Sequence, residues 1–221
     1  MFIGHYAVGT AGRAALPGRP GAPSLGTWFL AVQWLDLVWP LLVLAGVERV
    51  RIDPGNTAFT PLDFEHYPYT HSLLAALVWA ALFAAVYRWR TGHGRHALWL
   101  GGGVFSHWVL DWITHGPDLP LWPGSELKAG LGLWHSVPGT VVVEVALFAA
   151  AVVWYARATR AVDRTGRWAW WVLVAFLALT YVANLLGPPP PSATAVAVSA
   201  LALWLLVAWA WWIDRHRVAA G

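Results

Sequence analysis

Six long apolar stretches, separated by short polar segments, dominate the chain. They cover approximately residues 27 to 47, 70 to 89, 97 to 116, 136 to 156, 167 to 187 and 194 to 213. A helix of about 20 apolar residues crosses the hydrocarbon core of a bilayer, so the pattern predicts six membrane-spanning helices. Residues 2 to 16 are moderately apolar but too few to cross at about 1.5 Å per residue. We expect a partial-depth helix there, followed by a loop at 17 to 23.

The composition supports a membrane protein. Hydrophobic residues make up 58% of the chain and charged residues only 11%, which is too little charge to cover a soluble domain. The fold class expected is all-α, a polytopic helical bundle that forms one integral membrane domain over residues 1 to 221. The net charge of +3 lies in short loops rather than on one polar face, so nucleic acid is not an expected partner. Because the chain has no Cys, any metal must be held by His and carboxylates.

The basic residues are divided unevenly between the two predicted sides of the membrane. If the first full span runs from inside to outside, only Arg49, Arg51 and Lys128 of the 14 Lys and Arg residues fall on the outer side. The positive-inside rule therefore predicts that the N-terminal loop and the C-terminus are cytoplasmic. The outer loops hold the polar residues Asp53, Asp63, Glu65, His66, Asp118 and Glu126. We expect the chemistry of the protein to face outward.

The stretch Phe105 to His115 places His107, Asp111 and His115 four residues apart within an apolar segment. On a helix these side chains share one face. An ionisable side chain inside a bilayer costs several kcal/mol unless it is paired or bound. Neutral His and Asp are ordinary zinc ligands, so the pattern favours a bound divalent metal. A polar stripe hydrogen-bonded between helices is the alternative that this stretch alone leaves open.

Carboxylates in other spans converge on the same depth. Measured from the outer helix ends at about 1.5 Å per residue, Asp36 lies about 16 Å down, and His107 and Glu144 about 12 Å down. Separate helices that bring ionisable groups to one level predict a shared buried site. Pro40 removes the helical hydrogen-bond donor for the Asp36 carbonyl, so a kink-stabilising carboxylate is the alternative for Asp36. Glu144 is interpreted as a ligand, a general base or a partner of a buried imidazole.

More imidazoles lie at the outer ends of the predicted spans. His66 and His71 bracket the entrance to the second long span, with Thr70 as a candidate N-cap. His135 opens the fourth span and is either a ligand or an interfacial residue. Together with the residues above, these histidines provide enough ligands for one or two metals. The histidines expected to be solvated on the cytoplasmic side are His93, His96 and His216.

These residues lie in motifs that resemble those of a known family, the bacterial inner-membrane metal-dependent hydrolases. Its members share a Gly-His near the N-terminus, a Pro-Asp-x-Asp segment, a His-Arg-Gly-x-Thr-His-Ser-Leu-Leu segment and a Ser-His-x-x-x-Asp segment followed by Trp-Pro. The counterparts here are Gly4-His5, Asp36, His66 to Leu74, Ser106 to Asp111 and Trp122-Pro123. The resemblance covers about residues 1 to 123. It departs at Asp36, which stands alone where the family has two aspartates, and at Tyr67-Pro68, which replaces Arg-Gly.

The resemblance implies a multi-pass protein of the bacterial inner membrane that hydrolyses a poorly defined substrate. The predicted metal core lies within residues 1 to 157, and the helices in 167 to 213, which lack Asp, Glu and His between Trp168 and Ile213, are expected to pack and anchor. The residues predicted to ligate a zinc-like centre of one or two ions are His5, Asp36, His66, His71, His107 and Asp111, with His115 and His135 as further candidates. Glu144, Asp63 or Glu65 is predicted to accept the proton from an activated water.

A site in the outer half of the bilayer suits a lipid or lipid-linked substrate, and a phosphoester is our hypothesis within that class. The main alternative is a non-catalytic metal-binding protein or a transporter. Transport is disfavoured because the cytoplasmic halves of the spans carry almost no polar residues. A module that regulates another membrane protein is a third possibility. The sequence does not predict an oligomeric state.

Overall fold

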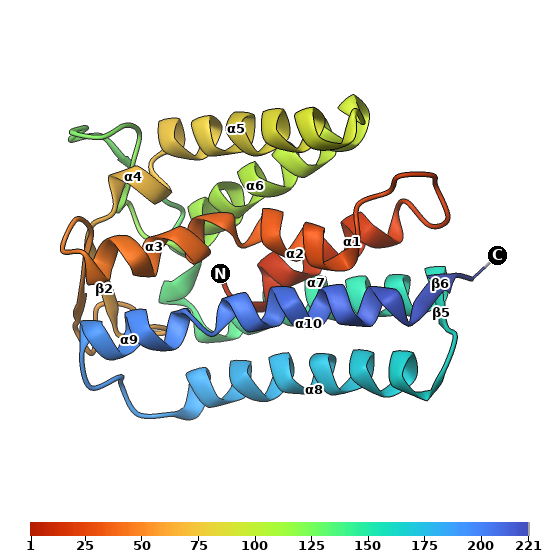
Figure 1. The fold of residues 1–221 in the computed structure, drawn as a ribbon. Helices are drawn as coiled ribbons and strands as arrows, with labels where there is room; N and C mark the ends of the chain where they lie inside the picture. The colour runs from red at the N-terminus through yellow and green to blue at the C-terminus, as the bar shows by residue number, and fades with distance from the viewer. Residues whose placement is uncertain (221) are drawn as a thin grey trace.

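The computed structural model describes residues 1 to 220 as a helical bundle with short β-pairs in its connections (Figure 1). The helices are α1 (Ile3–Ala14), α2 (Leu25–Val32), α3 (Trp34–Leu44), α4 (Pro68–His71), α5 (Leu73–Thr91), α6 (Gly94–Thr114), the 3-10 helix η1 (Leu133–His135), α7 (Val137–Ala158), α8 (Arg164–Leu186), α9 (Ala193–Ala200) and α10 (Leu203–Arg215). The strands are β1 (Arg49–Ile52), β2 (Leu62–His66), β3 (Leu119–Pro120), β4 (Lys128–Ala129), β5 (Thr159–Ala161) and β6 (Arg217–Ala219). They form three antiparallel pairs, β1–β2, β3–β4 and β5–β6, which the sequence did not predict.

The expected count of six spans is not confirmed. Among residues 1 to 220, α5, α7, α8 and the combined segment α9–α10 are long and apolar enough to cross a membrane. The pair α2 and α3 makes a fifth candidate span, bent by 52° at Gln33. The predicted span at 97 to 116 corresponds to α6, which does not meet the same test. Its three glycines at 101 to 103 and its polar residues, including His107 and Asp111, reduce its hydropathy.

Polar side chains explain where several helices begin. Ser72, Ser136, Asp163 and Ser192 each accept a hydrogen bond from the backbone N–H three residues later, at the starts of α5, α7, α8 and α9. These caps satisfy amide groups that have no partner inside the helix. The predicted cap at Thr70 is wrong, because α5 starts after Ser72 and the Thr70 hydroxyl bonds elsewhere.

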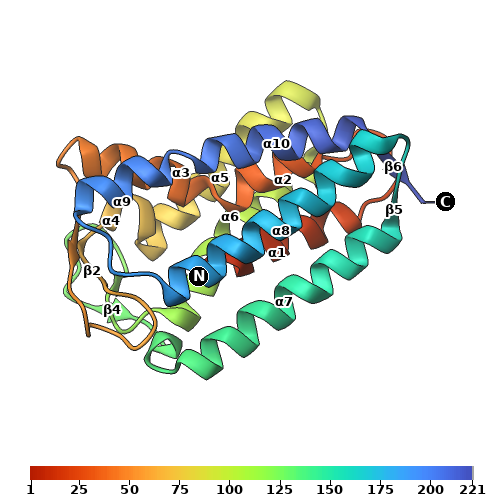
Figure 2. The same cartoon turned by 90° about the horizontal axis from the view of Figure 1, so that it is seen from below.

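The partial-depth N-terminal helix lies in the interior of the bundle. Figures 1 and 2 show α1 enclosed by neighbouring helices, and it packs against α7, α2 and α6. Most residues of α1 are buried, including His5 and Tyr6. By contrast, Leu82 on α5, Val142 on α7 and Leu179 on α8 are exposed and apolar. Such outer faces are suited to lipid, whereas α1 and α6 form the inner layer that carries the polar residues.

The connections rich in Arg lie together at one end of the bundle. In Figure 1 the end of α1, the α5–α6 turn, the α7–α8 connection and the C-terminal β6 lie at the right, whereas β2 and α4 lie at the left. The loops that the charge count assigned to one side of the membrane therefore lie at one end of the bundle. The side of the membrane that each end faces stays a prediction.

At the Arg-rich end, Asp163 holds the start of α8 and the C-terminal segment together. It accepts hydrogen bonds from the Gly166 N–H at 2.7 Å and from His216 Nδ1 at 2.6 Å. The Gly166 N–H first, and His216 second, lower the pKa of Asp163 from its ordinary value of 3.8. A carboxylate with a lowered pKa stabilises the folded state above its unfolded pKa, and this stability is lost as the pH falls through the folded value.

We therefore expect Asp163→Asn to lower the melting temperature in detergent slightly near pH 6, and the difference from the parent to vanish as the pH falls through the lowered pKa of Asp163. Asn retains the capping oxygen, so the comparison isolates the charge. Thermal unfolding of both proteins across pH 3 to 7 measures it. A constant difference over that range would contradict the assignment.

Candidate metal centre

Four segments bring five ionisable side chains into the interior of the bundle. They are His5 on α1, Asp36 on α3, His71 on α4, and His107 and Asp111 on α6. Two groups have ligand atoms that all lie within 4.8 Å of one another: His5, His107 and Asp111, and Asp36, His71 and His107. His107 belongs to both groups. The structure thus brings together five of the eight residues predicted as ligands.

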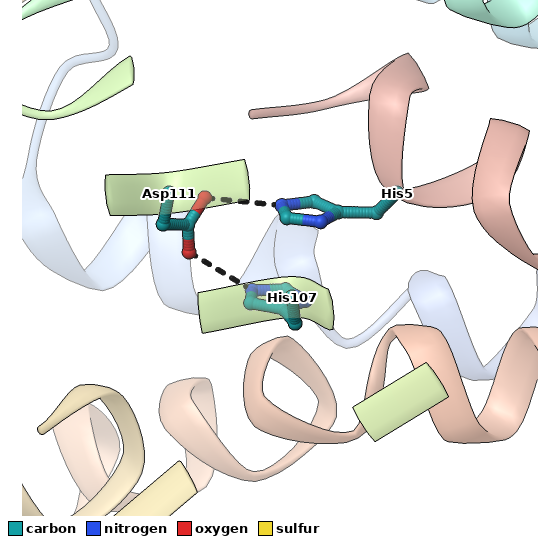
Figure 3. Close-up of side chains that lie close together, drawn as sticks. All are labelled: His5, His107 and Asp111. Carbon is teal, nitrogen blue, oxygen red and sulfur yellow. Dashed lines mark hydrogen bonds and ion pairs between the residues drawn. The ribbon is translucent and has the colours of Figure 1, made fainter. Parts of the chain in front are cut away.

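The first group is shown in Figure 3, where Asp111 lies to one side of the two imidazoles and directs one carboxylate oxygen toward each. Asp111 Oδ1 is 3.1 Å from His5 Nε2, and Asp111 Oδ2 is 3.1 Å from His107 Nε2. The rings of His5 and His107 stack with centroids 3.7 Å apart and an interplanar angle of 1°. Two imidazolium rings stacked so closely would repel each other, so this geometry favours at least one neutral imidazole.

The second group consists of Asp36 on α3 and His71 on α4 together with His107. Asp36 Oδ1 lies 3.4 Å from His71 Nε2 and 3.6 Å from His107 Nε2. His71 Nε2 also lies 3.7 Å from Asp111 Oδ2. The side chains of His71, His107 and Asp111 are at most 5% exposed, but that of Asp36 is 31% exposed. The cluster is therefore closed except on the side of Asp36.

The backbone at the bend between α2 and α3 orients His107. Its Nδ1 lies 2.7 Å from the carbonyl oxygen of Val32, the last residue of α2. A carbonyl only accepts, so Nδ1 must carry the proton and donate. The Nε2 atom of a neutral His107 then presents a lone pair to the cluster, which is the arrangement common among metal-ligating histidines.

A second hydrogen-bonded chain orients His71. The Thr70 hydroxyl lies 2.7 Å from Glu48 Oε2, to which it donates, and 2.7 Å from His71 Nδ1. Because its one proton goes to the carboxylate, the hydroxyl accepts from His71 Nδ1–H. Glu48 is 1% exposed and also accepts from the backbone N–H groups of Tyr69 and Thr70. His71, like His107, presents Nε2 to the cluster.

The cluster fits a cation. The Nδ1 protons of His71 and His107 are donated to Thr70 and to the Val32 carbonyl. In their neutral forms, both rings would therefore place Nε2 lone pairs 3.1–3.7 Å from the carboxylate oxygens of Asp36 and Asp111. Acceptors that face each other in a buried site need a positive charge between them. Ligand atoms about 2.0–2.1 Å from a tetrahedral zinc lie about 3.4 Å from one another, close to these separations. A proton on one imidazole is the alternative source of charge.

One positive charge already contacts the first group. The amino group of Met1 donates to Asp111 Oδ1 at 2.6 Å. This oxygen also faces His5, so Asp111 Oδ2 is the atom left to face His107 and His71. The amino group of Met1 therefore supplies positive charge to the first group but not to the group of Asp36, His71 and His107.

Three predicted ligands lie outside both groups. His115 Nδ1 is 3.0 Å from Asp118 Oδ1, and the ring packs against Trp134. His66 is in β2 with its ring near that of Tyr69, and His135 is exposed on η1.

The predicted proton acceptors are engaged with other partners. Arg51 pairs with Asp63 at 2.6 Å and with Glu65 at 3.2 Å, on an exposed face of the β1–β2 pair. Glu144 is buried, and its Oε2 accepts hydrogen bonds from the backbone N–H groups of Phe2 and Gly4. Glu144 thus caps the start of α1 and positions the helix that carries His5.

The structure also shows residues that the sequence did not indicate. Glu48 is the partner of Thr70, and Tyr67 donates to Asp118 Oδ1 at 2.6 Å. Burial raises the pKa of Tyr67 well above 10, so its hydroxyl keeps its proton. His96, expected to be solvated, is buried with 9% exposure, because α6 begins at Gly94 and turns this residue inward. None of these contacts follows from a local sequence pattern.

A comparison with protein families matches residues 1–188 of the chain to the model described as YdjM inner membrane protein. Since the match covers most of the chain, the protein belongs to this bacterial inner-membrane family. Comparisons with curated proteins and with solved structures gave no match.

Proposed function

We propose that this member of the YdjM inner membrane protein family is a metal-dependent hydrolase that acts on a lipid or lipid-linked phosphoester. The observation that carries the proposal is the buried cluster of three imidazoles and two carboxylates drawn from four segments. Zinc is the favoured ion, because imidazole and carboxylate are its usual ligands in proteins without cysteine at the site. One ion is favoured over two, since the single Nε2 lone pair of His107 is common to both groups.

The residues that hold the ion in this proposal are Asp36, His71, His107 and Asp111, with His5 paired to the second oxygen of Asp111. A divalent ion held there supplies Lewis-acid chemistry, polarising a phosphoryl oxygen and lowering the pKa of water. Asp36 is the side chain of the cluster with substantial exposure. We assign the open side of the site to it and propose that its carboxylate takes the proton from the attacking water.

A small polar hollow lies near the cluster and offers space for the polar group of a substrate. Its volume is about 170 Å³, and Glu65, Tyr67, Asp118 and Lys128 are among the residues that line it. The Tyr67 ring lies with its centroid 5.3 Å from that of His71, on the cluster side. Lys128 supplies one cation there, but Glu65 and Asp118 line the same hollow, so in this proposal the metal ion is the main counter-charge for a phosphate group. The hollow lies at the end of the bundle that we propose faces the periplasm.

A non-catalytic metal-binding protein is the second candidate. The nearly complete burial of His5, His71, His107 and Asp111 favours it, because structural metal sites are closed whereas catalytic sites keep a position open. The exposure of Asp36 is the feature that favours catalysis. A transporter is less well supported, because the carboxylates Asp36 of α3 and Asp111 of α6 lie at one level of the bundle rather than along a path through it.

Turnover of lipid phosphoesters by the purified protein tests the proposal. We expect hydrolysis of a member of a panel of phosphatidic acid, phosphatidylglycerol and polyprenyl diphosphate, loss of activity with chelator and recovery with Zn²⁺. His71→Ala is expected to lower kcat/KM by about 10³-fold or more, since it removes a ligand. His96→Ala, a buried histidine of α6 outside the cluster, is the control. Stoichiometric metal without turnover across the panel would favour the structural role.

A further inference from the structure

An apolar groove lies on the opposite side of α6 from the α5 contact, between α1, α6 and α7. Its volume is about 780 Å³, within the range of about 300–1,000 Å³ that is typical of small-molecule sites. Trp28 of α2 forms its floor, and Trp154 of α7 lies at its margin. Arg95 is the one charged residue that lines it. The groove extends roughly 12 Å along α6 from Arg95 to Gly103, at about 1.5 Å per residue.

Glycines keep this groove open. A Cβ atom on Gly12 would lie 2.6 Å from the Trp28 ring, and one on Gly103 would lie 3.2 Å from it. These two glycines therefore let the indole pack beneath the helices. A Cβ atom on Gly102 would meet nothing within 4 Å. Gly102 faces the empty space itself, so a larger side chain there would fill the groove without displacing its walls.

Arg95, Trp99 and Trp154 are the exposed charged and aromatic residues that line the groove. Arg95 is exposed in the first turn of α6 and has no hydrogen-bond or ion-pair partner among residues 1 to 220. Trp99 and Trp154 are about half exposed beside it. Tryptophan is enriched at the headgroup level of membranes, and arginine there attracts anionic lipid. This end of the bundle is also the Arg-rich end described above.

We propose that the groove binds an anionic phospholipid, with the phosphate at Arg95 and an acyl chain lying over Trp28 between α1 and α6. The apolar walls match a hydrocarbon chain, and the unpartnered guanidinium matches a phosphate. The site is distinct from the metal cluster, since the groove lining ends at Gly103, one helical turn before His107. The bound lipid supports the packing of α1, whose other end carries His5. The proposal does not depend on hydrolytic activity.

Native mass spectrometry of the detergent-purified protein tests this site with two lipids, phosphatidylglycerol and phosphatidylcholine of the same acyl chains. We expect the parent to retain phosphatidylglycerol in preference to phosphatidylcholine. Arg95→Gln should weaken phosphatidylglycerol binding about fivefold, the effect of one basic residue at a membrane surface. Gly102→Leu should remove most binding of either lipid by occupying the groove. The matched controls are Arg90→Gln and Ala85→Leu on the exposed face of α5, which should bind as the parent does.

The variants also separate loss of the lipid from loss of the fold. Gly102→Leu meets open space and replaces a helix-interior glycine by a better helix former, so its melting temperature in lipid-free detergent should equal or exceed that of the parent. Parent-like lipid binding by Arg95→Gln or by Gly102→Leu would overturn the proposal. Equal binding of the two lipids to the parent would also overturn it, because the guanidinium would then have no role.

Discussion

Replacing His107 with alanine is expected to abolish metal binding. His107 Nε2 belongs to both groups of candidate ligands, so no triad remains when it is removed. The purified parent should contain about one zinc per chain. The variant should retain less than about a tenth of it, since the site loses the ligand that both groups share and then binds zinc far more weakly. Elemental analysis after size-exclusion chromatography measures the content.

The control for this experiment is His96→Ala. His96 is on the same helix and is also buried, but lies outside both groups. It should keep the metal content of the parent. A His107→Ala protein that elutes as the parent does and still contains stoichiometric metal would exclude the cluster as the site. A parent without metal after purification in chelator-free buffer with added Zn²⁺ would favour a protonated imidazole as the buried cation.

The sequence predicted the helices well where apolar composition determines them. The stretches at 70 to 89, 136 to 156 and 167 to 187 correspond to α5, α7 and α8 within a few residues. Hydropathy works for these helices because their outer faces are apolar. The stretch at 97 to 116 also corresponds to a helix, α6, but its status as a membrane span is not confirmed, because one face of it carries the polar residues that approach α1, α3 and α4. A helix face that is covered by neighbouring helices does not need to be apolar.

The candidate site was predictable only in part. Because Asp36 and His107 lie at similar predicted depths, the sequence predicted that they share a buried site. In the structure, Asp36 Oδ1 lies 3.6 Å from His107 Nε2. The same argument included Glu144, but depth does not specify the direction of a side chain. Glu144 points to the amide groups at the start of α1. Likewise, the four-residue spacing predicted that His115 and Asp111 lie on the same face of a helix. However, α6 ends at Thr114, and His115 turns toward Asp118.

The residues that orient the histidines were not predictable, because they depend on contacts between distant segments. Glu48 precedes β1 and reaches Thr70, which is 22 residues away. Val32 contributes only a backbone carbonyl, so its identity carries no signal. Such partners become visible only when the bend at Gln33 and the β1–β2 pair have placed them.

Thr70→Val is expected to weaken metal binding without removing a ligand. The hydroxyl of Thr70 transmits the charge of Glu48 to His71 Nδ1 through two contacts of 2.7 Å. Valine has nearly the same shape but neither accepts nor donates, so His71 loses the partner that fixes its tautomer and ring orientation. Loss of such a partner typically costs roughly 10- to 100-fold in metal affinity. Competition with a chromophoric zinc chelator measures this affinity.

Thr70→Ser provides the matched comparison, because it restores the hydroxyl and loses only a methyl group. We expect its zinc affinity to lie within about threefold of the parent, since the hydrogen bonds to Glu48 and His71 are retained. Equal affinities for the valine and serine variants would show that packing at this buried position, rather than the hydroxyl, controls the site. Because Thr70 contacts His71 and not His5, a large effect of the valine variant also assigns the ion to the group of Asp36, His71 and His107.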